Sequence, residues 1–154
     1  MKARLAASAA LALGIVIGAS GCSMVTYQAT TEHYDASDGI SANVGTLDLR
    51  NILVITEAGE EDASLVFTVS NSGEDDAELT AEPVDGGEPV TLEVEAGSQV
   101  VLGADGDEPL TLEGLSADPG ALVSIYFSAE GAEGVELRVP VLDGSLPEYA
   151  DLLP

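Results

Sequence analysis

Short runs of alternating apolar and polar residues follow one another from about residue 42 to residue 142. In one of them Val90, Leu92 and Val94 alternate with Thr91 and Glu93. A period of two places the apolar side chains on one face of a β-strand. Turn-forming and acidic residues separate the runs, and no run after the N-terminal segment has a helical period. About eight such runs occur, over 47–55, 65–69, 77–81, 90–94, 100–102, 110–112, 123–127 and 135–141.

This pattern predicts an all-β fold, an antiparallel β-sandwich of about eight strands over residues 42–142. Asn51 interrupts the alternation before Ile52, and we expect a β-bulge there. Pro140 cannot donate a ladder hydrogen bond, so it is expected at an edge or near a strand end. Residues 143–154 contain Pro147 and Pro154 and show no strand pattern, and we expect this tail to be disordered.

The N-terminal segment has the layout of a bacterial lipoprotein signal. Lys2 and Arg4 precede an uncharged apolar stretch, and small residues lead directly into Cys22, the single cysteine of the chain. We therefore predict a signal peptide over 1–21, with Cys22 carrying diacylglycerol as the first mature residue. Two acyl chains would hold the protein firmly at the extracytoplasmic face of the cell membrane. An uncleaved signal anchor and a free thiol in a secreted protein are the alternatives.

Residues 22–41 are polar and small, and they show no apolar periodicity, which is typical of a flexible tether. About twenty such residues reach roughly 25 Å. All 28 acidic residues but only two of the four basic ones lie beyond residue 21, so loss of Lys2 and Arg4 changes the formal charge from −24 to −26. Such a chain cannot neutralise phosphates, which excludes nucleic acid as a partner. The acidity is typical of a soluble surface or of adaptation to high salt.

Candidate chemistry is sparse. His33 is the only histidine and lies in the predicted tether, where a catalytic base cannot be positioned, so we expect no enzyme activity. Three acidic runs could offer oxygen ligands to Ca²⁺, but none has the residue order of an EF-hand loop, and solvated turns are the simpler interpretation. These runs are 60–62, 74–76 and 105–108. No glycine-rich phosphate-binding motif occurs.

Several segments resemble a family of small actinobacterial lipoproteins related to the periplasmic copper chaperones called PCuAC. They are Gly45–Asn51 with the Ile-Leu-Val-Ile run that follows, Leu65–Gly73 with Asp75, Asp76 and Leu79, Pro109–Leu115, and Val139–Val141. The resemblance covers roughly residues 39–142. It implies a cupredoxin-like β-sandwich and, in that family, a copper site made of histidines and methionines.

In this chain the predicted sandwich contains neither histidine nor methionine, and Cu(I) favours such soft ligands. The only mature candidates are Met24 and His33, both in the tether. The sequence therefore predicts a non-enzymatic, membrane-anchored binding or scaffold module that binds an unidentified protein partner and carries no cofactor. The alternative function is metal trafficking, with copper bound through Met24 and His33 or a second cation bound by the acidic loops. An extracellular hydrolase that depends on His33 is the third alternative.

Overall fold

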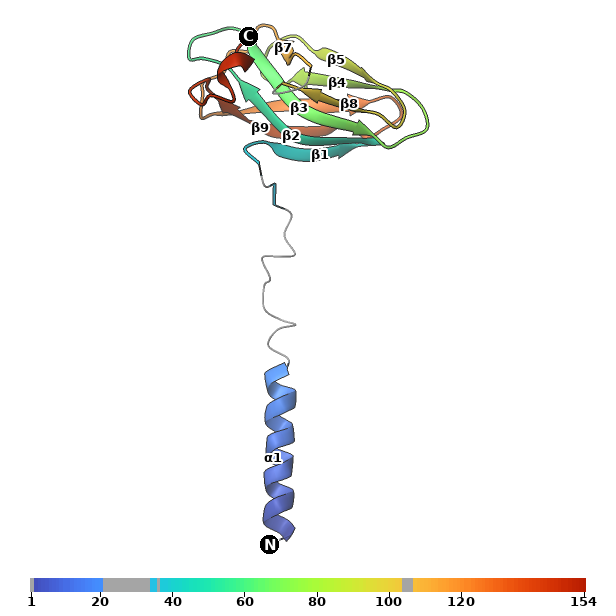
Figure 1. The fold of residues 1–154 in the computed structure, drawn as a ribbon, viewed down its shortest axis with the longest axis vertical. Helices are drawn as coiled ribbons and strands as arrows, with labels where there is room; N and C mark the ends of the chain where they lie inside the picture. Colours follow the sequence, from blue (N-terminus) through green and yellow to red (C-terminus); the bar gives the residue numbers. More distant parts are fainter. Residues whose placement is uncertain (1, 21–33, 36, 104–106) are drawn as a thin grey trace. The chain divides into compact units, whose positions relative to one another are not determined.

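The computed structural model describes residues 2–20, 34–35, 37–103 and 107–154. It divides into two compact units, 1–34 and 35–154. The first unit contains helix α1, and the second contains nine strands and a short 3-10 helix (Figure 1). The elements are α1 (Lys2–Ser20), β1 (Ile40–Val44), β2 (Leu47–Ile55), β3 (Ala63–Asn71), β4 (Ala77–Pro83), β5 (Val90–Val94), β6 (Gln99–Leu102), β7 (Leu110–Leu112), β8 (Leu122–Ala129), β9 (Val135–Leu142) and η2 (Ala150–Leu152).

Helix α1 covers most of the predicted signal peptide. Ala, Leu and Ile are frequent in it, and its apolar residues lie all round rather than on one stripe. Among the described residues, no helix combines the length and the apolar character needed to cross a membrane.

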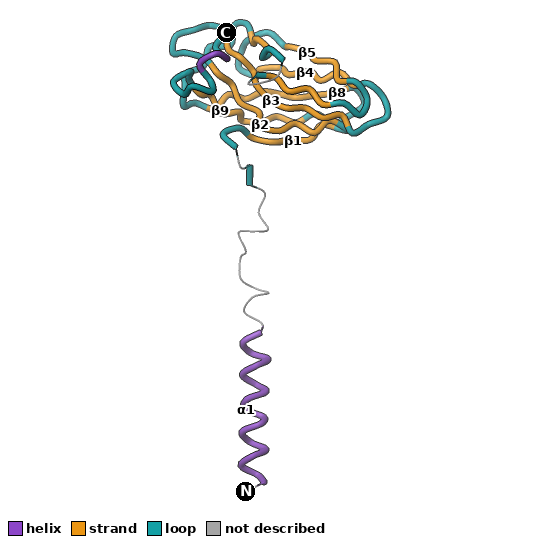
Figure 2. The backbone as a smooth tube through the Cα atoms, in the orientation of Figure 1, coloured by secondary structure: helices purple, strands orange, loops and turns teal. Residues whose placement is uncertain are grey.

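The strands of the second unit form one mixed sheet in the order β5-β4-β8-β9-β2-β3-β6, with β1 paired to β2 and β7 paired to β3. The sheet curls around a common core and is nearly barrel-like, as the strands of Figure 2 show. The prediction of a mostly β fold is confirmed, and β2 to β9 match the eight predicted runs. Strand β1 was not predicted. It begins at Ile40, within the stretch 22–41 that was assigned to the tether.

One pairing departs from the antiparallel prediction. Strand β9 pairs with β8 in antiparallel register as far as Pro140, and then runs parallel to β2 through Val141 and Leu142. Pro140 therefore lies at the point where the pairing of β9 with β8 ends and its pairing with β2 begins, two residues before the end of β9. The alternation of residues predicts which side chains share a face, but it does not say which strands become neighbours.

Asn51 forms the predicted irregularity. Its φ is 54°, in the left-handed region that Asn tolerates better than most residues, and the register of β2 with β3 shifts between Arg50 and Leu53. The Asn51 side-chain oxygen accepts a hydrogen bond from the Gly39 amide at 3.0 Å. A Cβ on Gly39 would lie 2.7 Å from that oxygen, so only glycine fits at this entry to the fold. The prediction of a bulge is confirmed.

The main core lies inside the curled sheet. Phe67 of β3 and Phe127 of β8 are the only two phenylalanines of the chain, and both are buried. Their rings meet edge to face with centroids 6.4 Å apart, which joins the two sides of the sheet. Asn71, at the end of β3, is also buried, and its amide donates to the carbonyl oxygens of Asp75 and Val94.

A second, smaller apolar cluster lies outside the sheet, on the outer surface of β2 and β3. We call this surface the covered face, and it consists of Leu53, Ile55 and Val66 with Leu152 of the C-terminal segment packed on them. Leu152 is only 7% exposed. The tail 143–154, expected to be disordered, instead packs here and carries η2. The physical reason is that Ile52–Ile55 is a continuous apolar run, so β2 needs cover on both faces.

The C-terminal segment is also fixed at the entry of the chain into the fold. The Tyr149 hydroxyl donates a hydrogen bond of 2.6 Å to the Asp38 carboxylate. Glycine at position 103, with φ of 81°, lets the chain after β6 approach the same cluster, because a Cβ there would lie 2.9 Å from a methyl group of Val66. The folded unit thus extends on both sides beyond the predicted limits of 42 and 142.

Candidate functional site

The three residues that the sequence singles out, Cys22, Met24 and His33, lie outside the described residues. Lipid attachment at Cys22 and metal binding by Met24 and His33 therefore stay predictions. From residue 34 to the C-terminus the chain contains no cysteine, histidine or methionine. Any site in the folded unit must be built from oxygen ligands, aromatic rings, arginine or apolar side chains.

Where the structure describes the acidic runs, their carboxylates are exposed and two of them hold turns. The Asp62 carboxylate accepts a hydrogen bond from the Gly114 amide at 3.1 Å, and that of Asp76 accepts one from the Ala96 amide at 2.8 Å. Within the described part of the chain, no group of three or more Asp, Glu, His or Cys residues is arranged to hold a metal ion. These contacts give the runs a structural role at strand ends.

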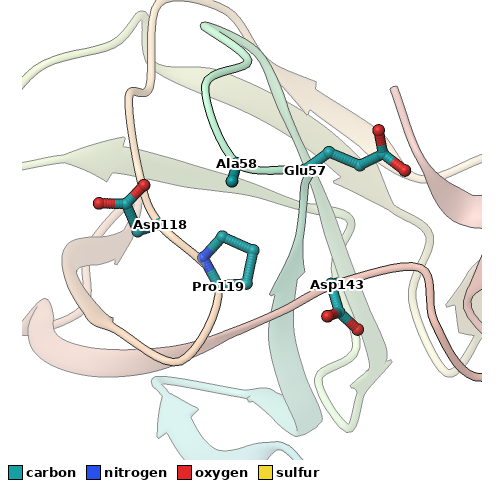
Figure 3. A pocket seen from close by; sticks show the side chains of 5 residues that line it. All are labelled: Glu57, Ala58, Asp118, Pro119 and Asp143. Carbon is teal, nitrogen blue, oxygen red and sulfur yellow. The ribbon is translucent and has the colours of Figure 1, made fainter.

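A depression lies at one end of the sheet, where three loops meet. It has a volume of about 480 Å³ and is lined by Glu57, Ala58, Asp118, Pro119 and Asp143. Figure 3 shows the three carboxylates around the Pro119 ring, pointing away from one another. A smaller depression of about 250 Å³ shares Glu57 and continues to the C-terminal residues. Carboxylates that diverge in this way do not converge on one bound ion.

Two groups of the C-terminal segment have pKa values shifted by hydrogen bonds. The Ser145 side-chain hydrogen bond, helped by the Ser145 backbone amide, lowers the pKa of the exposed Asp143 carboxyl. The hydrogen bond to Asp38 raises the pKa of Tyr149 to about 12. Both groups belong to the segment that packs on the covered face, and both shifts come from local hydrogen bonds rather than from a buried reactive centre.

The outer surface of β4, β8 and β9 is different in character. Strand pairing places Tyr126 between Glu82 of β4 and Glu136 of β9. In the next row the Val84 amide donates to the Ser124 carbonyl, and Ser124 lies opposite Arg138. We call this surface the open face, and its outward side chains used below are Glu82, Val84, Leu122, Tyr126, Glu136 and Arg138.

Large apolar side chains are exposed on the open face. Val84 is 52% exposed, Leu122 51% and Tyr126 39%. The sequence already indicates that Tyr126 points away from the core, because it alternates with Ile125 and Phe127. It does not indicate that Val84 lies on the same face, since that depends on the pairing of β4 with β8.

Comparison with known proteins shows the fold alone. No known family profile and no curated protein sequence matches the chain. Among solved structures, the copper-bound PCuAC domain from PmoF2 matches with a TM-score of 0.53 and 17% identity, over 68% of this chain and 98% of that chain. The apo PmoF2 PCuAC domain matches with a TM-score of 0.57 and 18% identity, over 70% of this chain and 98% of that chain.

The apo PCuAC domain from PmoF1 matches with a TM-score of 0.55 and 16% identity, over 66% of this chain and 98% of that chain. The fold is PCuAC-like. This supports the resemblance found in the sequence as far as the fold is concerned. Cu(I) prefers imidazole, thioether and thiolate ligands. The chain beyond residue 33 contains no histidine, methionine or cysteine that could supply them.

Proposed function

We propose that this chain is a non-enzymatic lipoprotein, anchored at the extracytoplasmic face of the membrane through Cys22, whose PCuAC-like domain acts as a protein-binding module. The observation that carries the proposal is a PCuAC-like fold from which every soft metal ligand is missing beyond residue 33. The fold that a metal-binding domain uses is kept, while the residue types that bind Cu(I) are absent. The proposal therefore places the function on the surface of the domain.

The anchor is tested by Cys22→Ala. This change removes the atom that carries the lipid, so we expect the protein to leave the membrane fraction while the domain stays folded. The measurement is membrane fractionation followed by circular dichroism of the released protein. Ser23→Ala, one residue further along, is the matched control and should stay in the membrane fraction. Retention of the Cys22→Ala protein in the membrane would contradict the lipid anchor.

Copper trafficking is the second candidate function, and the match to a copper-bound PCuAC domain favours it. It would have to use Met24 and His33 in the segment before the domain. A Cu(I) competition titration of the lipidated chain in non-ionic detergent tests it, because lipidation blocks the Cys22 thiol. We expect no competition with a high-affinity Cu(I) chelator. One-to-one binding that is lost in His33→Ala and Met24→Ala would replace the binding-module proposal with copper trafficking.

A further inference from the structure

The open face is an uncovered sheet surface with exposed apolar side chains at its centre. Three of the exposed large hydrophobic residues of the folded unit, Val84, Leu122 and Tyr126, gather on it around Ser124. On the covered face, by contrast, the C-terminal segment buries the outward apolar residues. Exposed apolar side chains that share one sheet face with polar residues form a candidate protein-interaction site. Within the described part of the chain, no segment packs over the open face as the C-terminal segment does over the covered face.

Charge on the open face indicates what kind of partner fits. Tyr126 lies in register between Glu82 and Glu136, so this partly exposed aromatic residue has a glutamate opposite it on each neighbouring strand. A lysine or arginine side chain over this ring would gain a cation–π contact and two ionic neighbours at once. All but one of the 28 acidic residues lie beyond residue 33, with only Arg50 and Arg138 to oppose them, and this field attracts cationic partners.

We propose that the open face is the docking surface for a partner protein that presents basic side chains interleaved with apolar ones. The inference rests on the proposed function, since it names the surface and the partner class of the binding module. The basic side chains lie over Tyr126 and beside Glu82 and Glu136. The apolar side chains of the partner cover Val84 and Leu122. Burial of these two residues contributes to the free energy of binding, and salt does not screen this contribution.

Arg138 limits which partners bind. It lies on the open face one row from Glu136, whereas Arg50, the other arginine, forms an ion pair with Asp48 at 3.1 Å. Among the described residues, none forms an ion pair with the Arg138 side chain. A basic partner meets repulsion at Arg138, and an acidic partner or a second copy of this chain would meet attraction there. The sign of an Arg138→Glu effect therefore distinguishes these occupants.

Two capped hexapeptides of equal charge serve as probes, one of alternating lysine and valine and one of alternating lysine and serine. They are titrated into the full lipidated chain in non-ionic detergent, with binding followed through backbone amide shifts in NMR spectra. We expect the lysine–valine peptide to bind about tenfold more tightly, because only it covers the apolar residues. Its shifts should concentrate in β4, β8 and β9. Equal affinities, or shifts spread over the acidic loops, would overturn the proposal.

Variants then locate the contact. Tyr126→Ser should weaken the lysine–valine peptide by about tenfold and Val84→Ser by a smaller factor. Val101→Ser is the matched control, because Val101 is 38% exposed on β6, and it should have no effect. Arg138→Glu should strengthen binding by about threefold. Weaker binding of the lysine–valine peptide by Arg138→Glu would overturn the basic partner, and concentration-dependent self-association through the same residues would replace it with a second copy of the chain.

The two proposals fail separately. If neither peptide binds the open face while the chain is lipid-anchored and does not compete for Cu(I), the docking surface is wrong and the binding module stands. If His33-dependent Cu(I) binding is found, the proposed function is wrong whatever the peptides do.

Discussion

The covered face and the open face are both outer surfaces of the sheet, but the outward side chains on them are buried to different extents. On the covered face, Leu53 and Ile55 of β2 point outward and are buried beneath the C-terminal segment. On the open face, Leu122 and Tyr126 of β8 point outward and stay exposed. The difference follows the local sequence. Strand β2 ends in four consecutive apolar residues, whereas β9 alternates from Val135 to Val139, with Glu136 and Arg138 on its outer side.

The comparison shows that a continuous apolar run and an alternating run make different demands on the rest of the chain. The continuous apolar run of β2 requires cover on both faces of the sheet, and the C-terminal segment covers the outer one. The alternating run leaves an outer surface of mixed polar and apolar side chains, and no segment among the described residues covers it. The covered face therefore adds to the stability that the main core provides, while the open face is available for recognition.

The largest expected effect is a contrast between two identical substitutions. Leu53→Ala should lower the free energy of unfolding by about 3 kcal/mol, because it leaves a cavity under the C-terminal segment. Leu122→Ala removes the same atoms from the open face and should change it by less than about 0.5 kcal/mol. Urea denaturation followed by circular dichroism measures both. Similar losses for the two variants would show that the open face is covered in solution.

The covering segment itself is tested next. Leu152→Ala should cost about 2 kcal/mol, near the lower limit for a buried leucine, because a chain end relaxes easily around the cavity. Leu146→Ala is the matched control in the same segment, since Leu146 is 47% exposed, and its effect should be small. Amide hydrogen exchange in β2 should also accelerate in Leu152→Ala. Unchanged exchange there would mean that the segment contributes no cover.

A smaller effect is expected from the hydrogen bond that fixes this segment. Tyr149→Phe removes the bond to Asp38 and should cost about 0.5 to 1 kcal/mol at neutral pH. The pKa of Tyr149 is raised from 10.0 to about 12, so the bond stabilises the fold fully below pH 10, and its contribution is lost as the pH rises toward 12. Unfolding measured between pH 9 and pH 12 should show this alkaline loss in the wild type only.

Tyr126→Phe provides the control for the tyrosine titration, because it removes a hydroxyl from the open face and leaves the bond to Asp38 in place. The high-pH phase of tyrosinate absorbance should persist in Tyr126→Phe and disappear in Tyr149→Phe. Its persistence in Tyr149→Phe would assign the raised pKa to another tyrosine.

The smallest effect concerns Asp143, at the start of the covering segment. The Ser145 side chain is the main cause of its lowered pKa, so Ser145→Ala should raise that pKa toward 3.8. The interaction stabilises the fold above pH 3.8 and is lost as the pH falls through the lowered pKa. Side-chain carboxyl shifts in NMR pH titrations measure it. Ser145→Thr keeps the hydroxyl and should leave the titration unchanged.

Much of the fold could be predicted from residue order. Alternation located β2 to β9, and the interruption at Asn51 located the bulge, because both depend on local geometry. Strand β1 was missed because Ile40–Val44 has a single strongly apolar residue at each end and lies next to a polar stretch. It exists because β2 offers it a paired edge and Gly39 fits against Asn51.

The sequence predicted candidate sites at Cys22, Met24 and His33, and it could not predict the open face. The first three depend on residue type and chain position, which are visible in the sequence. The open face depends on Glu82, Tyr126 and Glu136, which lie far apart in the chain and meet only when β4 and β9 pair on either side of β8.

By itself, the sequence determined the alternating strands, the acidic surface and the lack of soft metal ligands beyond residue 33. These are properties of neighbouring residues and of composition. Only the tertiary structure decided the parallel contact of β9 with β2, the burial of Leu152 on the covered face and the row of Glu82, Tyr126 and Glu136 on the open face. Each of these depends on which strands become neighbours when the sheet closes, and a period of two residues carries no information about that choice.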